Sequence, residues 1–123
     1  GCQPCHTGPA MGGQSFEYAD LKGDFFGGRA KTNDDNGLMN FTKKETDKHR
    51  FRVPTLRNVE LTWPYMHDAS AQTLEEAITK MYHYQLGYDK LDKTEVRLLV
   101  AFLKTLTGEY QGKPVRGEVC PAP

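Results

Sequence analysis

Hydrophobic residues recur at helical spacing in two segments of the second half of the chain. In the first segment they stand three or four residues apart: Leu74, Ala77, Ile78 and Met81. This spacing is typical of an amphipathic helix that turns one apolar face towards a core. Thr73 and Glu76 form a capping box at the start of this helix, and Gly87 falls in the loop that follows it.

A second capping box, from Asp92 to Glu95, opens the stronger of the two predicted helices. The inward stripe of this helix consists of Val96, Leu99, Val100, Leu103 and Leu106. Phe102 flanks the stripe, and Gly108 stands where a C-terminal cap is expected. We therefore expect the helix to continue to a cap at Gly108, with a Gly- and Pro-rich, irregular tail behind it.

The first part of the chain lacks such a pattern. Residues 7–46 are rich in glycine and polar side chains and show neither helical nor strand periodicity, which predicts long loops with at most a short helical turn. The stretch Thr32–Gly37 superficially resembles a calcium loop. However, the residue six positions after Gly37 is Lys43, where an EF-hand needs a glutamate. We therefore interpret this stretch as a solvated turn.

Residues 51–68 combine apolar side chains with the pairs Val53-Pro54 and Trp63-Pro64. Two prolines with aromatic residues between them favour an ordered but irregular segment that packs against something large. Together with the two helices, these observations predict an all-α, loop-rich fold.

The length of 123 residues suits one small domain, and sixteen basic and sixteen acidic residues give a formal net charge of zero. This balance gives no reason to expect binding to nucleic acid or to a membrane surface. No apolar run approaches the length of a membrane-spanning helix, so we expect no such span.

The candidate chemistry lies at the start of the chain, where Cys2, Cys5 and His6 form a Cys-x-x-Cys-His motif. At this spacing two thiols can add to the two vinyl groups of one porphyrin, and the histidine can bind its iron. A bare Cys-x-x-Cys pair also occurs in redox dithiols and zinc sites. The adjoining His6 and the absence of a second cysteine pair argue against both. We therefore expect one covalent haem c, and with it a periplasmic location.

The third cysteine, Cys120, lies in a Val-Cys-Pro-Ala-Pro tail. An intermolecular disulfide or a tether is one interpretation, and a free thiol in a disordered tail is the one that we favour.

A six-coordinate haem needs a ligand opposite His6, and the candidates are Met11, Met39, Met66, Met81, His49, His67 and His83. A thioether suits an electron carrier because it favours ferrous iron. Met11 is too close to His6 in the sequence to reach the other face of the haem easily. Periodicity alone does not choose among Met39, Met66 and Met81.

Four blocks of sequence carry a resemblance to a known family. They are residues 51–62 (Phe-Arg-Val-Pro-Thr-Leu-Arg-Asn-Val-Glu-Leu-Thr), 63–68 (Trp-Pro-Tyr-Met-His-Asp), 73–77 (Thr-Leu-Glu-Glu-Ala) leading to Met81, and 99–108 (Leu-Val-Ala-Phe-Leu-Lys-Thr-Leu-Thr-Gly). From Cys2 to about Gly108 the chain resembles the C-terminal haem domain of bacterial dihaem cytochrome c peroxidases. The resemblance implies a c-type cytochrome domain at 1–108, with long loops around a covalently bound haem, and a C-terminal tail at 109–123.

The resemblance also implies roles for individual residues. His6 and Met81 would hold the iron of a high-potential, electron-transferring haem. Backbone carbonyls of Thr62 and Pro64 would help to bind a calcium ion between two haem domains. A family that matures a tryptophan-derived quinone has tyrosine as the distal ligand, and Tyr82 is adjacent, but Met81 aligns with the methionine ligand.

Two pairs of nearby residues have open roles. Arg52 and Arg57 are candidates to pair with haem propionates, with solvated surface arginines as the alternative. Trp63 and Tyr65 are candidates for an electron path between haems, although packing is the more usual role of an aromatic residue beside a proline.

On the resemblance, the partners are an N-terminal peroxidatic haem domain and a small periplasmic electron donor, a cytochrome c or a cupredoxin, and a homodimer is allowed. Electrons would pass through this haem to a second one that reduces hydrogen peroxide to water.

Only Gly1 precedes Cys2, so the helix that usually packs on the C-terminal helix is missing. We therefore expect the C-terminal part of a longer polypeptide. The alternative is a stand-alone monohaem electron carrier without catalytic activity.

Overall fold

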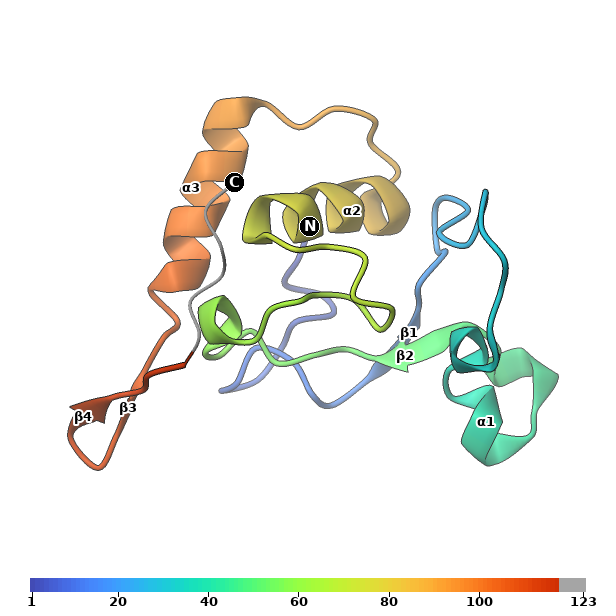
Figure 1. Ribbon diagram of the computed structural model, residues 1–123, viewed down its shortest axis with the longest axis horizontal. Coiled ribbons are helices and arrows are strands. Elements are labelled where there is room, and N and C mark those ends of the chain that lie inside the picture. Colours follow the sequence, from blue (N-terminus) through green and yellow to red (C-terminus); the bar gives the residue numbers. More distant parts are fainter. Residues whose placement is uncertain (118–123) are drawn as a thin grey trace.

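The computed structural model describes residues 1–117, which fold into a helical body joined to a loop-rich lobe (Figure 1). In chain order the elements are β1 (Phe16–Tyr18), the 3-10 turn η1 (Asn33–Asn36), α1 (Met39–Thr42), the 3-10 turn η2 (Glu45–Asp47), β2 (Arg50–Arg52), the 3-10 turn η3 (Val59–Leu61), α2 (Leu74–Leu86), α3 (Lys93–Lys104), β3 (Glu109–Tyr110) and β4 (Lys113–Pro114). Helices α2 and α3 are the only long elements among these residues.

The start of α2 shows one half of the predicted capping box, because the carboxylate of Glu76 accepts from the N–H of Gln72 at 2.6 Å and not from that of Thr73. The hydroxyl of Thr73 accepts a hydrogen bond from the backbone N–H of Glu76, at 3.2 Å. The helix ends at Gly87, whose φ of 75° is the left-handed conformation that glycine adopts without strain. Both ends of this helix are therefore determined by local sequence.

The start of α3 confirms the prediction, because Asp92 and Glu95 form the expected capping box. Its end does not. The helix ends at Lys104, with Thr105 as the cap, so the prediction of a cap at Gly108 is wrong. The N–H of Gly108 instead donates to Oδ1 of Asn58 at 2.9 Å. The helix is thus capped locally at Thr105, and Gly108 contacts a distant segment beyond the helix end.

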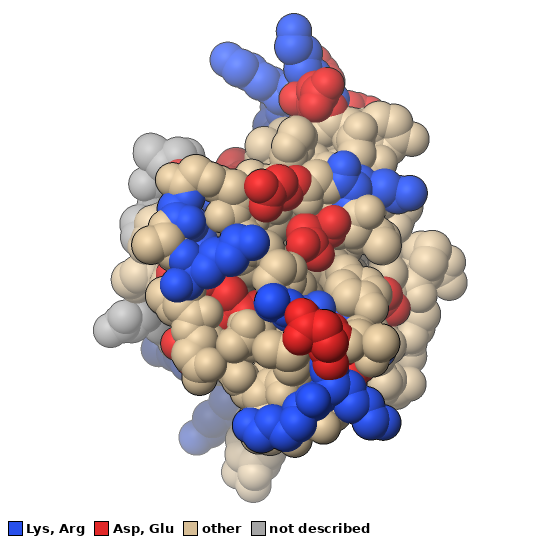
Figure 2. All heavy atoms as spheres, turned by 90° about the vertical axis from the view of Figure 1, so that its right-hand side faces the viewer, with Lys and Arg blue, Asp and Glu red and all other residues tan. Residues whose placement is uncertain are grey.

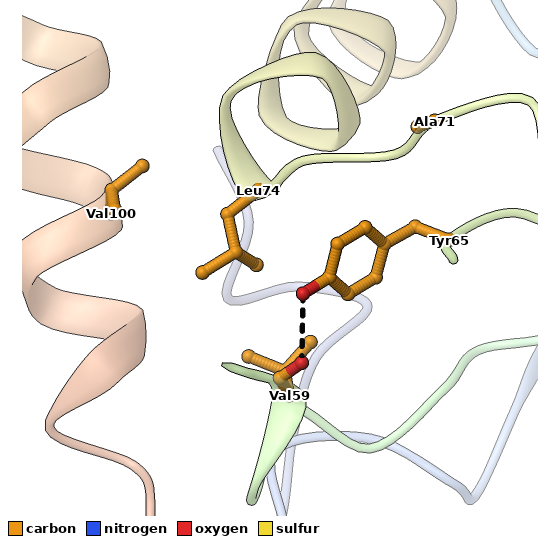
Figure 3. Close-up of a cluster of buried hydrophobic side chains, with 5 residues drawn as sticks. All are labelled: Val59, Tyr65, Ala71, Leu74 and Val100. Carbon is orange, nitrogen blue, oxygen red and sulfur yellow. Dashed lines mark hydrogen bonds between the residues drawn. The ribbon is translucent and has the colours of Figure 1, made fainter. Parts of the chain in front are cut away.

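The core of the helical body lies where α2, α3 and the segment between η3 and α2 meet. Its buried side chains are Val59, Tyr65, Ala71, Leu74 and Val100 (Figure 3). The hydroxyl of Tyr65 donates to the carbonyl of Val59 at 3.1 Å. This buried hydrogen bond joins the segment before α2 to the start of η3. Val96 and Leu103 pack against this cluster, so the predicted inward stripe of α3 faces a partner within this chain.

Strands β1 and β2 pair antiparallel, with Phe16 opposite Arg52 and Tyr18 opposite Arg50. This ladder leads from the helical body to the lobe that carries α1 (Figure 1). The predicted all-α class therefore holds for the long elements and needs correcting for two short β-pairs. Strands of two or three residues are too short to show an alternating pattern, and their partners are distant in sequence.

The second β-pair, β3 with β4, lies in the segment that we expected to be an irregular tail. Its turn residues Gln111 and Gly112 both have positive φ, 51° and 72°, as a two-residue hairpin turn requires. Cys120 lies outside the described residues. No helix within residues 1–117 is long and apolar enough to cross a membrane.

Charged side chains of both signs are mixed on the face that carries α1 (Figure 2). On this face neither lysine and arginine nor aspartate and glutamate form an extended patch of one sign. The local distribution of charge thus matches the zero net charge of the whole sequence.

Candidate haem site

The Cys-x-x-Cys-His motif folds into one tight turn. The backbone N–H of Cys5 and that of His6 both donate to the carbonyl of Cys2, at 3.3 and 3.0 Å. These helical contacts place positions 2, 5 and 6 on one side of the turn, since residues three and four apart are neighbours on a helix. Both cysteines are free thiols, Cys2 exposed and Cys5 half-buried. The geometry therefore presents two thiols and an imidazole together, as attachment of one porphyrin requires.

The imidazole of His6 has a defined orientation. Its Nδ1 lies 3.2 Å from the backbone carbonyl of Met11. A carbonyl oxygen can only accept, so this contact needs the proton on Nδ1, and in the neutral ring Nε2 then keeps its lone pair. This is the tautomer that can bind a metal ion through Nε2.

Burial of the Cys5 thiol is the main cause that raises its pKa, and the charges of Glu17 and Cys2 raise it further. A zinc site lacks support, because no group of three or more His, Cys, Asp or Glu side chains within residues 1–117 could hold a metal.

Met81 lies on the inward face of α2, seven residues after buried Leu74 and three after Ile78, which packs on the core. Its side chain is nevertheless 37% exposed. Four residues further along this face, Gln85 donates to the carbonyls of Tyr18 and Ala19 at 2.9 and 2.8 Å. Neighbouring positions on the face are thus covered by protein, while the thioether of Met81 is accessible.

The N-terminal turn and α2 are close together. A Cβ built on Gly1 would lie 2.9 Å from Cδ2 of Leu86, so the turn lies directly against the end of this helix. Met81 precedes Leu86 by five residues, which is about 7.5 Å along the axis of an α-helix. The fold therefore brings the cysteine motif and the accessible thioether into one region.

Most of the other candidate ligands have contacts elsewhere. Met66 packs against the core cluster, and Met39 begins α1, which packs with η1 and η2. His49 pairs with Asp20 at 2.9 Å and His67 with Asp35 at 2.7 Å. His83 is also close to a carboxylate, that of Asp89, at 3.6 Å. These contacts disfavour Met66 and the three histidines as ligands. Met39 stays a candidate beside Met81, and the assignment of Met81 as the ligand stays a prediction.

Arg52 and Arg57 line one cavity of about 460 Å³, together with Gly12, Gly13, Thr55 and Asn58. The Nε of Arg52 donates to the carbonyl of Gly13 at 3.0 Å. Within residues 1–117 neither guanidinium forms an ion pair. The cavity adjoins Met11, whose carbonyl contacts His6. Two arginines without a carboxylate partner in its wall suit a pair of carboxylates. The residues present therefore fit a haem whose propionates face this cavity.

Thr62 and Pro64 follow η3 and are both exposed. The hydroxyl of Thr62 donates to the carbonyl of Val59 at 3.1 Å, which fixes the turn. Trp63, which lies between them, packs against the core cluster, and so do Leu56 before it and Met66 after it. The proposed role of the two carbonyls in binding calcium stays a prediction.

Two features of this region escape analysis of the sequence. The first is the carbonyl of Met11, which has no residue-specific signal because any residue carries a carbonyl. The second is Asp35, which is only 2% exposed and is held by Arg29 and His67. The interpretation of residues 32–37 as a solvated turn is therefore wrong for Asp35. The pattern Thr32-x-x-Asp35 could have revealed it, because it forms a capping box.

Comparison with known proteins gives consistent similarities. The chain is 48% identical over 109 residues to cytochrome c551 peroxidase of Nitrosomonas europaea, a match that covers 89% of this chain and 31% of that protein. It is also 48% identical over 109 residues to a cytochrome c peroxidase of Escherichia coli, with 89% and 23% covered. The match to cytochrome c551 peroxidase of Pseudomonas aeruginosa is 36% over 130 residues, with 100% and 36% covered.

Among solved structures, a MauG-like protein associated with microbial copper homeostasis matches with a TM-score of 0.67 and 32% identity. This match covers 88% of the present chain and 42% of that chain. No protein-family model matches. The chain spans between about a quarter and about a third of the length of the three peroxidases.

Proposed function

The chain belongs to the family of bacterial cytochrome c peroxidases, and from this premise we propose that it is the electron-transferring haem c domain of a dihaem enzyme. Residues 1–108 would form the haem domain, as the C-terminal part of the enzyme. The observation that carries the proposal is the arrangement of the Cys2–His6 turn against α2, whose inward face exposes Met81.

Six side chains would hold the cofactor. Cys2 and Cys5 would form the thioether links, and Nε2 of His6 and the sulfur of Met81 would bind the iron from opposite faces. When bound, the haem takes up and releases one electron at a time. Arg52 and Arg57 would balance the charge of the propionates, which a partly buried haem cannot leave uncompensated.

A ligand pair of this kind suits transfer of electrons rather than reaction with peroxide. With the imidazole of His6 and the thioether of Met81 both bound to it, the iron would offer peroxide no free position. The soft thioether also favours the ferrous state. We accordingly place no acid–base residue for peroxide cleavage in this chain.

The activity proposed for the whole protein needs parts beyond this chain. A small periplasmic donor, a cytochrome c or a cupredoxin, would deliver electrons to this domain. The domain would pass them to a peroxidatic haem in an N-terminal domain, where hydrogen peroxide takes up two electrons and two protons to give two waters. A calcium ion held in part by the carbonyls of Thr62 and Pro64 would join the two domains, and the enzyme could form a homodimer.

Two measurements test the proposal. The first is the intact denatured mass of the protein purified from its native source. A mass of more than twice this chain, with two haems, supports the enzyme. A mass equal to this chain plus one haem would contradict it and favour the monohaem carrier.

The second measurement is the absorption spectrum of the Met81→Ala variant of the haem-loaded protein. We expect the low-spin histidine–methionine spectrum to be lost, because Met81 is the proposed methionine ligand and Met66 packs against the core cluster. Met39→Ala and Met66→Ala are matched controls that should retain the spectrum. Survival of the spectrum in Met81→Ala, with loss in Met39→Ala, would overturn the assignment.

A further inference from the structure

The hairpin of β3 and β4 extends from the end of α3, in the segment that we expected to be an irregular tail (Figure 1). Its base is closed by the N–H of Val115, which donates to the carbonyl of Gly108 at 3.0 Å. Gly108 directly precedes β3. This residue is therefore the point at which the end of α3 and the two strands of the hairpin meet.

Three hydrogen bonds tie the base of the hairpin to the start of η3. The N–H of Gly108 donates to Oδ1 of Asn58 at 2.9 Å, and the N–H of Asn58 donates to the carbonyl of Leu106 at 3.0 Å. The hydroxyl of Thr107 donates to Oε2 of Glu60 at 3.0 Å. The base of the hairpin and the start of η3 therefore form one fixed unit.

The side chain of Arg57 lies against this unit. A Cβ built on Gly108 would lie 3.0 Å from Nη2 of Arg57, 3.5 Å from Cζ and 3.8 Å from Nε. The guanidinium thus occupies the space that a side chain at position 108 would fill. Within residues 1–117 Arg57 forms no ion pair. The described carboxylates therefore do not hold the guanidinium, and the backbone at Gly108 supports it.

We infer that the base of the hairpin, through Gly108, is a positioning element that holds the guanidinium of Arg57 in the wall of the cavity of about 460 Å³. The inference rests on the proposed function, in which this cavity receives the haem propionates. A guanidinium that is already fixed loses less conformational freedom when it pairs with a carboxylate. On this inference the haem domain extends beyond Gly108 and includes the hairpin.

The position of Arg57 bears on electron transfer through the charge of the iron. Ferric haem carries one more positive charge than ferrous haem, so a nearby guanidinium disfavours the ferric state and raises the reduction potential. This Coulomb effect weakens as the distance grows. A guanidinium that moves away from the cavity should therefore lower the potential.

The test is the midpoint potential of the haem-loaded Gly108→Ala variant. Gly108 does not have a positive φ, so alanine suits its backbone. The atoms that must give way are those at the end of the flexible Arg57 side chain. We expect a lower potential and faster exchange of the Nε proton of Arg57 in proton NMR of the ferrous protein. Stability in urea should not fall, because alanine restricts the unfolded chain more than glycine does.

Gly117→Ala is the matched control. Gly117 also lacks a positive φ, and a Cβ there would lie 3.2 Å from Cβ of Leu61, a comparably close contact that does not involve Arg57. Only Gly108→Ala should change the potential and the exchange of the Nε proton. A potential in Gly108→Ala equal to that of the parent protein, or an equal shift in Gly117→Ala, would overturn the inference.

A double variant shows whether Gly108 acts through Arg57. Arg57→Gln alone should lower the potential more than Gly108→Ala does, because it removes the charge. Adding Gly108→Ala to Arg57→Gln should then change the potential no further, since the group that Gly108 positions is already gone. A shift from Gly108→Ala that is as large in the Arg57→Gln background as in the parent protein would contradict the positioning role.

A second pair of variants loosens the base of the hairpin without adding a side chain beside Arg57. Thr107→Val removes the hydroxyl that donates to Glu60 at nearly constant shape, and Thr107→Ser keeps it. We expect a smaller fall in potential and faster exchange of the Nε proton in the valine variant alone. Identical values in both variants would count against the inference.

Failure of this inference is distinguishable from failure of the proposed function. If Cys2 and Cys5 carry no haem, the proposed function fails. If haem is attached and Met81→Ala loses the low-spin spectrum, but Gly108→Ala leaves the potential unchanged, the positioning role of the hairpin alone fails.

Discussion

The carboxylate of Asp35 is the least exposed charged group within residues 1–117. It accepts hydrogen bonds from Nη1 and Nη2 of Arg29 at 2.9 and 2.6 Å, and from the N–H of Thr32 at 2.6 Å. Nε2 of His67 lies 2.7 Å from it. This one side chain therefore ties the loop at residues 29–36 to the Trp-Pro-Tyr-Met-His-Asp segment. Asp35→Asn keeps the shape of the side chain and removes its charge. One carboxylate oxygen becomes an NH₂ group, which cannot accept the hydrogen bonds that Arg29 and the N–H of Thr32 donate to Asp35.

The structure gives the size of the expected effect. Removing one partner of a buried ion pair costs roughly 3–5 kcal/mol. Arg29 is 32% exposed and retains Asp68 at 3.3 Å, so water and this second carboxylate compensate part of its charge. We therefore expect Asp35→Asn to lower the free energy of unfolding by about 3 kcal/mol at pH 7, the lower end of that range.

The effect depends on pH in a defined direction. The hydrogen bonds from Arg29 are the main cause that lowers the pKa of Asp35 far below its usual value, with smaller contributions from His67 and Thr32. A carboxyl whose pKa is lowered on folding stabilises the fold above its unfolded pKa of about 3.9, and this stabilisation is lost as the pH falls further. The difference between the parent protein and Asp35→Asn should therefore shrink below about pH 4.

The assay is urea unfolding of the haem-loaded protein, followed by circular dichroism at pH 7 and in steps down to pH 3. Asp34→Asn is the matched control, because Asp34 is the exposed neighbour in the same 3-10 turn. We expect it to change stability by less than about 0.5 kcal/mol. Equal losses in the two variants, or a difference that does not shrink with falling pH, would refute the reasoning.

Two further predictions concern hydrogen bonds at turns and caps. Asn58→Ala removes the acceptor for the N–H of Gly108 and leaves alanine at a φ of 61°, so the free energy of unfolding should fall by about 2 kcal/mol. Asn58→Gly should lose less, and an equal loss would show that the backbone conformation is not strained. Thr73→Ala should cost about 1 kcal/mol through loss of the cap of α2. Thr73→Ser keeps the hydroxyl and should restore stability in the same denaturant titration.

The parts of the fold that the sequence predicts are those determined by neighbouring residues. The starts of α2 and α3 depend on Thr73 and Asp92, whose side chains bond amides two or three positions further on. The role of Gly108 depends instead on Asn58, which accepts the N–H of Gly108 from fifty positions away. The pairing of β1 with β2 likewise joins distant residues. Local patterns carry no information on such contacts.

The candidate site divides in the same way. Covalent chemistry fixes the spacing of Cys2, Cys5 and His6, so the motif is readable directly. For Met11, sequence reasoning considers the thioether and sets it aside as a ligand, whereas the structure shows that its carbonyl contacts His6. Asp35 is hidden for another reason. Its burial depends on Arg29 and His67, and a polar, glycine-containing stretch gives no sign that such partners will converge.

The block at residues 51–62, which carries much of the family resemblance, is only partly in the core. Val53 and Val59 are buried and Leu56 packs against the core cluster, while Arg52, Pro54, Thr55 and Arg57 are exposed. Its contacts are mostly backbone contacts with the segment that follows the haem motif, through the carbonyls of Val53 and Pro54 and the N–H of Leu56. Exposed side chains do not explain why such a block should have a defined sequence. A backbone that must meet the Met11–Gly12 turn at fixed positions does explain it, because proline at 54 and a left-handed Asn58 restrict the path of the chain between them. Substitutions at the exposed positions of this block should therefore affect the protein according to the backbone contacts they disturb, and only weakly according to the surface they bury.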